Sequence, residues 1–198
     1  MKHLLLFATI LLGQKNFAQE MNLSFQTGYA FGETNSFKKI MLFTAVTGGY
    51  EAQIKNDNFF SLSAGGAALK FSYTDTGNIN VFESRYCLNI NLSLKRYFFI
   101  NQRSDFFIEF GPVFNYCLQD KKLKKKINLD QTVSQQNLGN DLGLAVTGAY
   151  KKMLTDKISI AIGVAAQRNY LFHYKNETDK IQVKTTAFSI AVYRKLGK

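Results

Sequence analysis

The chain has 198 residues, the length of a single domain. It carries 25 lysines and arginines against 14 aspartates and glutamates, a formal net charge of +11, which favours anionic partners. There are 18 phenylalanines and 10 tyrosines but one proline, two cysteines and no tryptophan. Beyond the N-terminus no segment has the long uncharged apolar run that a transmembrane helix needs, so the sequence argues against a helical membrane protein.

Residues Met1–Gln19 have the pattern of a secretory signal peptide. A short basic start precedes the apolar run Leu4–Leu12, and Phe17-Ala18-Gln19 fits a cleavage region with cutting after Ala18 or Gln19. The alternative is a buried N-terminal helix. We therefore expect an exported protein with one domain over residues 20–198.

The rest of the chain alternates apolar and polar residues in strand-length segments. The predicted strands are about Met21–Phe31, Lys39–Gln53, Phe59–Tyr73, the two halves of a hairpin within Phe82–Leu118, Asp141–Lys152, Ile158–Phe172 and Gln182–Leu196. The turns at Lys55–Asn58, Asn101–Ser104 and Leu154–Lys157 are short, whereas the other connectors are longer and more polar: Gly32–Ser36, Asp75–Asn80, Gln119–Asn140 and Lys175–Lys180. Small residues on both sides of Ala64–Ala68 leave the faces of the third strand open.

The hairpin within Phe82–Leu118 shows the alternation most clearly. Its even positions are bulky and apolar, and its odd positions are mostly polar or small. An antiparallel pairing in which the two residue numbers sum to 204 keeps both faces intact, and a slip of one residue would mix them. This register sets Lys95 beside Glu109 and Cys87 beside Cys117.

Short turns at one end and longer loops at the other predict an all-β fold, an eight-stranded antiparallel up-and-down transmembrane β-barrel. A barrel of eight strands has little interior volume, so the bulky apolar face should point outward into lipid. A closed ring also satisfies every backbone group, as lipid requires. The alternative is a soluble lipocalin-like barrel, in which the aromatic face would line a dry pocket.

Several short segments resemble the outer-membrane β-barrel domain family of Gram-negative bacteria that is usually labelled "porin family". The matching segments are Phe17–Gln19, Leu94–Phe98, Phe110–Phe114, Asp141–Leu144, Gly148–Tyr150 and Tyr193–Leu196. The chain departs from the family by ending in Leu196-Gly197-Lys198 instead of an aromatic residue. The resemblance implies a barrel in the cell outer membrane, without a defined activity for most members; some relatives serve protein secretion.

The predicted inner face carries two candidate features. Lys95 and Glu109 form a polar pair in the lumen, either as part of a conduction path or as a structural plug, which we favour because eight strands leave no open channel. Cys87 and Cys117 are predicted to be adjacent and able to form a disulfide, since disulfides persist in exported proteins. The alternative is two independent small inward residues. Pro112 should mark a bulge or kink.

A basic run lies in the longest connector and consists of Lys121, Lys122, Lys124, Lys125 and Lys126. It fits contact with the phosphates of lipopolysaccharide or with another anionic partner, and equally a solvated loop. We also expect Arg96, Lys151 and Lys152 to extend toward the periplasmic boundary of the membrane.

Catalysis is not expected. Barrel enzymes that act on lipid use histidine with serine or a carboxylate, and the exported part has one histidine, His173, near Thr178 and Asp179. The sequence contains no metal-ligand cluster and no cofactor motif, so we expect no cofactor. The predicted protein is a monomeric barrel with a structural, interaction or surface-binding role, in contact with outer-membrane lipid and not with nucleic acid. The alternatives are a small diffusion porin, a lipid-acting barrel enzyme and a scaffold for secretion.

Overall fold

The computed structural model describes residues 19–33, 38–75, 79–126, 129–133, 141–173 and 180–196. The predicted signal peptide lies outside this part of the chain except for Gln19, which is the first residue of β1. No helix in the described ranges is long and apolar enough to cross a membrane.

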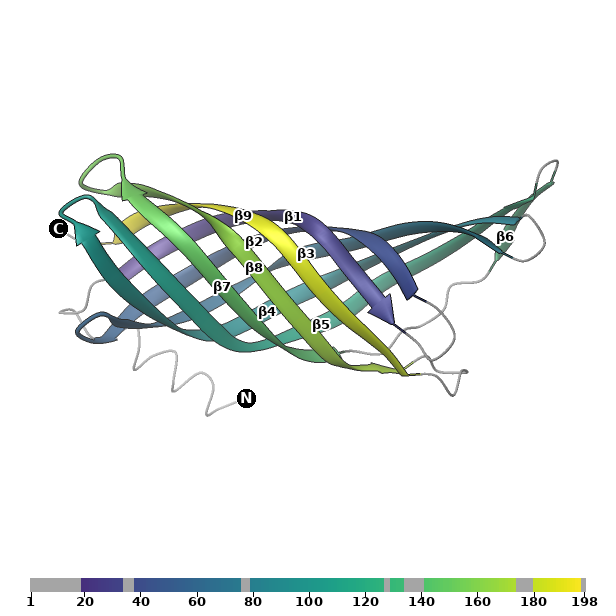
Figure 1. The fold of residues 1–198 in the computed structure, drawn as a ribbon, viewed down its shortest axis with the longest axis horizontal. Coiled ribbons are helices and arrows are strands. Elements are labelled where there is room, and N and C mark those ends of the chain that lie inside the picture. Colours follow the sequence, from purple (N-terminus) through teal and green to yellow (C-terminus); the bar gives the residue numbers. More distant parts are fainter. Residues whose placement is uncertain are drawn as a thin grey trace.

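Antiparallel strands make up the described structure: β1 (Gln19–Glu33), β2 (Lys38–Lys55), β3 (Asn58–Asp75), β4 (Ile79–Asn101), β5 (Ser104–Lys126), β6 (Leu129–Val133), β7 (Asp141–Met153), β8 (Ile158–His173) and β9 (Lys180–Leu196). They follow the order β4-β3-β2-β1-β9-β8-β7-β5-β6, and a further pairing of β4 with β5 closes the ring. Eight strands form the barrel, because β6 pairs with β5 at its far end. Figure 1 shows the strands winding obliquely around the barrel.

The predicted strands and the predicted hairpin register are confirmed. Cys87 faces Cys117, Ile90 faces Phe114, and Lys95 faces Glu109. The register shifts between Tyr86 and Cys87, where β5 holds one extra residue. At Pro112 the pairing with β4 is interrupted, as expected for a residue without a backbone donor, while the pairing of Pro112 with Leu144 of β7 continues.

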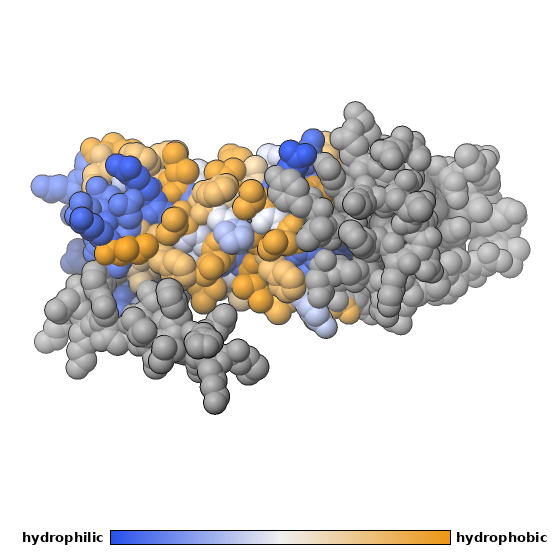
Figure 2. Space-filling model, turned by 90° about the horizontal axis from the view of Figure 1, so that it is seen from below, coloured by the Kyte–Doolittle hydropathy of each residue, from blue (hydrophilic) through white to orange (hydrophobic). Residues whose placement is uncertain are grey.

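The bulky apolar face points outward, as predicted. Leu94 is 62% exposed and Phe110 is 54% exposed, whereas Lys95, the next residue after Leu94 on β4, is 2% exposed. Figure 2 shows the apolar side chains as an orange zone over the middle of the barrel, with polar ones at one end. The lipocalin-like alternative is therefore wrong, because the aromatic face covers the outside. The structure also assigns the two faces of the third strand, β3: Ser61, Ala67 and Leu69 are buried, and Leu62 is exposed.

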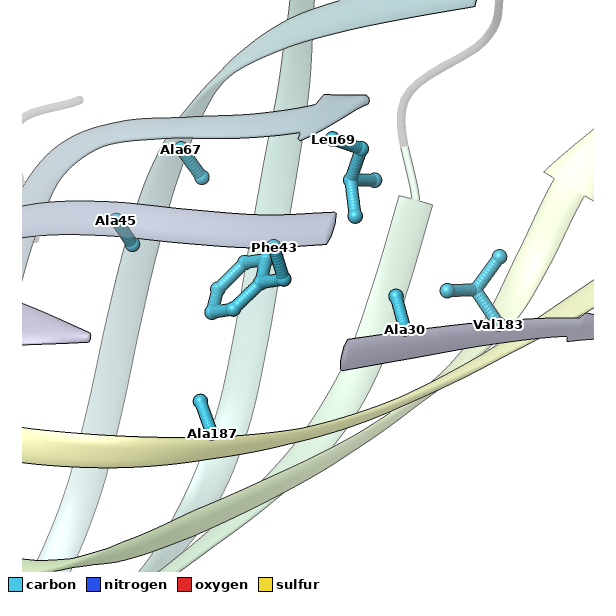
Figure 3. Close-up of a cluster of buried hydrophobic side chains, with 7 residues drawn as sticks. All are labelled: Ala30, Phe43, Ala45, Ala67, Leu69, Val183 and Ala187. Carbon is cyan, nitrogen blue, oxygen red and sulfur yellow. The ribbon is translucent and has the colours of Figure 1, made fainter. Parts of the chain in front are cut away.

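The interior holds two small apolar clusters at different heights. Nearer the long loops, side chains of β1, β2, β3 and β9 meet inside the barrel (Figure 3): Ala30, Phe43, Ala45, Ala67, Leu69, Val183 and Ala187. Nearer the short turns lie Tyr97, Phe107, Ala149, Ala161, Ala191 and Tyr193. Most members are alanines, as the narrow interior requires.

The connector Gln119–Asn140 differs from the prediction. The sequence predicts a loop there, but β5 continues to Lys126 and β6 follows from Leu129 to Val133. The barrel pairing of β5 with β7 ends at Asn115, so this part stands beyond the barrel (Figure 1). We call it the outer extension: residues 71–75 of β3, 79–83 of β4, 121–126 of β5, and β6. The lysine run concealed these strands, because lysine is depleted in strands and the run shows no apolar alternation.

Candidate functional site

A buried lysine lies at the centre of the barrel interior near the short turns. Lys95 of β4 forms an ion pair with Glu51 of β2, and its Nζ lies 3.2 Å from Oε2 of Glu109 on β5. Its Nζ also donates to the Tyr193 hydroxyl of β9 at 3.3 Å, and it lies 4.3 Å from the centre of the Phe107 ring. The predicted partner Glu109 is thus within reach, and a second carboxylate joins it from across the barrel.

A second buried ion pair adjoins the first. Lys151 of β7 pairs with Glu20 of β1 and donates to the Tyr97 hydroxyl at 3.2 Å. Tyr97 in turn donates to Oε2 of Glu51 at 2.9 Å and so connects the two pairs. The Lys151 ammonium also lies 4.3 Å from the centre of the Tyr193 ring. The expectation that Lys151 extends to the membrane boundary is wrong, because its strand position points inward.

We call these connected residues the lumen cluster: Glu20, Glu51, Lys95, Tyr97, Glu109, Lys151 and Tyr193. They come from β1, β2, β4, β5, β7 and β9, so the cluster spans the inside of the ring. Every charge in it has a partner of opposite sign, as burial requires. The two ammonium groups also face aromatic rings, whose quadrupoles favour a cation. The cluster therefore places ion pairs and aromatic rings across the inside of the ring near the short turns.

A further polar chain crosses β4, β5 and β7 nearer the long loops. Nδ2 of Asn89 donates to Oδ1 of Asn115 at 2.7 Å, and Nδ2 of Asn115 donates to Oδ1 of Asp141 at 2.7 Å. Arg85 interacts electrostatically with the same carboxylate. All four residues are buried, so this wall of the interior is polar while the opposite wall carries the apolar cluster of Figure 3.

Two small polar cavities lie between these layers. The volume open to the centres of water molecules is about 30 Å³ in one and about 40 Å³ in the other. Gln26, Thr47, Ser63, Asn91 and Thr147 line both. The Asn91 side-chain oxygen is buried without a protein partner. The cavities can hold a few water molecules each and no larger solute.

The other predicted residues lie apart from the lumen cluster. Cys87 is buried and faces Cys117 in the backbone register, while the Cys117 side chain lies outside the described part. His173 ends β8 opposite Lys180, and Thr178 and Asp179 lie outside the described residues.

The five lysines Lys121, Lys122, Lys124, Lys125 and Lys126 lie in the β5 part of the outer extension. Their backbone partners include Glu83 of β4 and Asp130 of β6, and the other partners are mostly uncharged. The extension therefore concentrates positive charge beyond the long-loop end of the barrel.

Sequence reasoning missed Glu20, Glu51, Tyr97, Lys151 and Tyr193 as parts of one site. The alternation along each strand places these positions on the inner face. A charged residue at an inward position was the feature that could have identified them. Parity does not reveal which residues meet across the barrel. Within the described residues no group of three or more histidine, cysteine or acidic side chains could hold a metal ion.

Comparison with solved structures shows which known fold the chain has. The chain aligns with outer membrane protein OprG of Pseudomonas aeruginosa at 12% identity and a TM-score of 0.56, covering 92% of this chain and 97% of that chain. For Neisserial surface protein A the identity is 13% and the TM-score 0.53, over 89% of this chain and 97% of that chain. This chain has the fold of an eight-stranded outer-membrane β-barrel.

A major outer membrane protein of Thermus thermophilus is also similar, with 9% identity, a TM-score of 0.52, and coverage of 90% of this chain and 99% of that chain. No family model matches the sequence. No curated protein matches it either. The likeness is thus one of fold, and membership of the "porin family" stays a prediction.

Proposed function

We propose that the protein is an integral barrel of the outer membrane with a closed lumen and a structural and surface-binding role. The observation that carries the proposal is the lumen cluster, which fills the inside of a barrel whose outside is apolar. The protein is expected to act as a monomer and without a cofactor, through the side chains that it exposes at the two membrane surfaces.

Insertion in lipid is supported by the exterior. Leu23, Leu94 and Val164 are among the outward residues that are half exposed or more, and the closed ring leaves no unpaired edge for lipid to meet. Outward tyrosines, including Tyr29 near the long loops and Tyr150 near the short turns, fit the aromatic belts of such barrels. Membrane fractionation with gel heat-modifiability tests this: a soluble protein whose mobility ignores boiling contradicts it.

A closed lumen distinguishes this role from that of a diffusion porin. Ions or solutes would have to pass two ion pairs, that of Lys95 with Glu51 and that of Lys151 with Glu20. The neighbouring cavities hold only a few water molecules. Reconstitution into planar bilayers should give no steady conductance. Stable conductance steps, absent from a bilayer containing a boiled sample, would favour the porin alternative.

The surface-binding part of the proposal rests on the outer extension. Five lysines on one strand, with few acidic neighbours in register, favour an anionic partner such as the phosphates of lipopolysaccharide. We expect lipopolysaccharide binding by the folded protein to weaken when the five lysines become glutamine. Replacing Lys70 and Lys184, which are exposed on β3 and β9, gives the matched control. Unchanged binding in the five-lysine variant would remove the role of the extension.

The two remaining alternatives have direct tests. A lipid-acting enzyme would lose acyltransfer or esterase activity in His173→Ala, whereas we expect no such activity in either form. A scaffold for secretion would bring secretion components through a pull-down from detergent extracts, and would do so less well in the five-lysine variant.

A further inference from the structure

Cations recur at the same place in the register of the short-turn end. Asn58, Ser104 and Ile158 are the first residues of β3, β5 and β8. Each faces a cation on an adjoining strand: Arg96, Lys152 and Arg194, respectively. All three cations are exposed. They alternate with the inward residues Lys95, Lys151 and Tyr193, so they lie on the outer face.

The short turns add a second set of cations beside the first. Arg103 and Lys157 are exposed in the turns before β5 and β8, and Lys55 is exposed at the end of β2, next to the turn before β3. Backbone hydrogen bonds hold two of these turns against the neighbouring strand, from Met153 N to Arg103 O at 2.8 Å and from Lys195 N to Lys157 O at 3.0 Å. We call the six residues Lys55, Arg96, Arg103, Lys152, Lys157 and Arg194 the basic rim.

Acidic residues do not balance the basic rim. Asp156 is the exposed acid of the described short-turn end, and Asp57 and Asp105 are half-buried. Glu20 and Glu51, at the same end, are occupied by lysines inside the lumen. No rim cation forms an ion pair with another described residue. The rim thus presents a ring of unpaired positive charge.

Large apolar residues are interleaved with the rim. Ile54 is 48% exposed, Phe99 68%, Ile100 59% and Leu154 59%, all in or beside the short turns. The Arg96 guanidinium lies 5.5 Å from the centre of the Phe98 ring. Exposed apolar groups next to cations are typical of segments that lie where lipid tails meet headgroups.

We propose that the basic rim binds the headgroups of anionic phospholipids in the periplasmic leaflet. The inference rests on the proposed membrane residence and on the short turns facing the periplasm. A lipid is favoured over a protein partner because the cations lie around the barrel, on three separate strand pairs, and adjoin the apolar exterior. A protein would more naturally meet a patch on one side.

The test measures lipid selectivity of the folded protein in phosphatidylcholine vesicles by electron paramagnetic resonance of spin-labelled lipids. Spin-labelled phosphatidylglycerol should associate about fivefold or more strongly than spin-labelled phosphatidylcholine, the effect expected for each cation at an anionic headgroup. The preference should fall in the triple variant R96Q/K152Q/R194Q and with added salt. The pair K70Q/K184Q, which removes exposed cations nearer the long loops, should keep it.

The outcomes separate the two proposals. A wild-type protein that inserts and is heat-modifiable but shows no preference overturns the rim inference alone, whereas failure to insert overturns the membrane proposal. The inference is also overturned if the preference for phosphatidylglycerol is lost in K70Q/K184Q but remains in the triple rim variant. Should the triple variant not fold, the single variants R96Q, K152Q and R194Q are measured, and at least one must reduce the preference.

Discussion

The buried charge of Lys95 is stabilised by the side chains that surround it. Its ammonium is buried with Glu51, Glu109 and Tyr193 around it. Lys95→Met keeps the length of the side chain but leaves two carboxylates without their cation. We expect a loss of about 3–5 kcal/mol in the free energy of unfolding, measured by urea titration of the folded gel band.

Lys184→Met is the control for this loss, because Lys184 is exposed on β9 and should change stability by no more than about 0.5 kcal/mol. Adding Glu51→Gln and Glu109→Gln to Lys95→Met should recover part of the loss, since the uncompensated charges disappear. Equal stability of Lys95→Met and wild type would mean that the pairs contribute nothing.

Cys87 and Cys117 are the two cysteines of the chain. The backbone register sets them directly opposite each other in the β4–β5 hairpin, and disulfides persist in proteins that a cell exports, as the N-terminal sequence predicts for this one. We predict that they form a disulfide. A thiol count on the denatured, unreduced protein should find none, and two on the reduced protein; two before reduction would contradict the bridge.

Glycines recur on four strands that run away from the short-turn end, β1, β3, β5 and β8. Cβ atoms at Gly28, Gly65, Gly111 and Gly163 would lie 1.9–2.2 Å from backbone oxygens of a neighbouring strand in the ring, on β9, β2, β4 and β7. The strongly coiled strands approach so closely there that a side chain has no room. The four strand pairs thus share one constraint, which composition alone does not reveal.

Gly65 and its neighbour Gly66 test this constraint. A Cβ at Gly65 would lie 1.9 Å from the Val46 carbonyl oxygen, whereas one at Gly66 would have nothing within 4 Å. Gly65→Ala should therefore lower the free energy of unfolding by about 1–3 kcal/mol through overpacking, and Gly66→Ala should leave it nearly unchanged. Both are read from the urea midpoint of the folded band; similar midpoints for the pair would show that β3 can move aside.

The strands themselves were predictable from sequence because an apolar outside and a narrow lumen inside impose a period of two on every strand. The alternation predicted the hairpin register correctly from Cys87 onward, whereas Tyr86 pairs with Gln119, one residue beyond the predicted partner. Parity also placed Lys151 inward, against the expectation from its position near a turn. Its partner Glu20 could not be inferred, because the contact joins residues 131 positions apart across the barrel. The far end of β5 and the strand β6 were missed because the lysine run there resembles a loop.

Over the whole molecule the positive charge is divided between two ends. The lumen cluster holds three carboxylates and two lysines, so it adds nothing to the positive excess behind the net charge of +11. The basic rim and the lysines of the outer extension carry much of it. The basic rim is spread over several strands, whereas the lysines of the outer extension lie on β5 alone. In the proposed membrane setting, both would favour anionic lipid.

Barrel and outer extension should also be separable. The pairing of β5 with β7 stops at Asn115, and that of β2 with β3 starts at Leu42 and Lys70, so the ring closes without residues 121–133. Deleting these residues shortens the connection between the barrel parts of β5 and β7, and chains tolerate such changes best at loop ends. We expect a heat-modifiable protein whose free energy of unfolding changes by less than about 1 kcal/mol, but whose lipopolysaccharide binding matches the five-lysine variant. A deletion protein that no longer folds would show that the extension is needed to close the ring. One that binds lipopolysaccharide as well as the wild type would show that the barrel itself, not the extension, binds it.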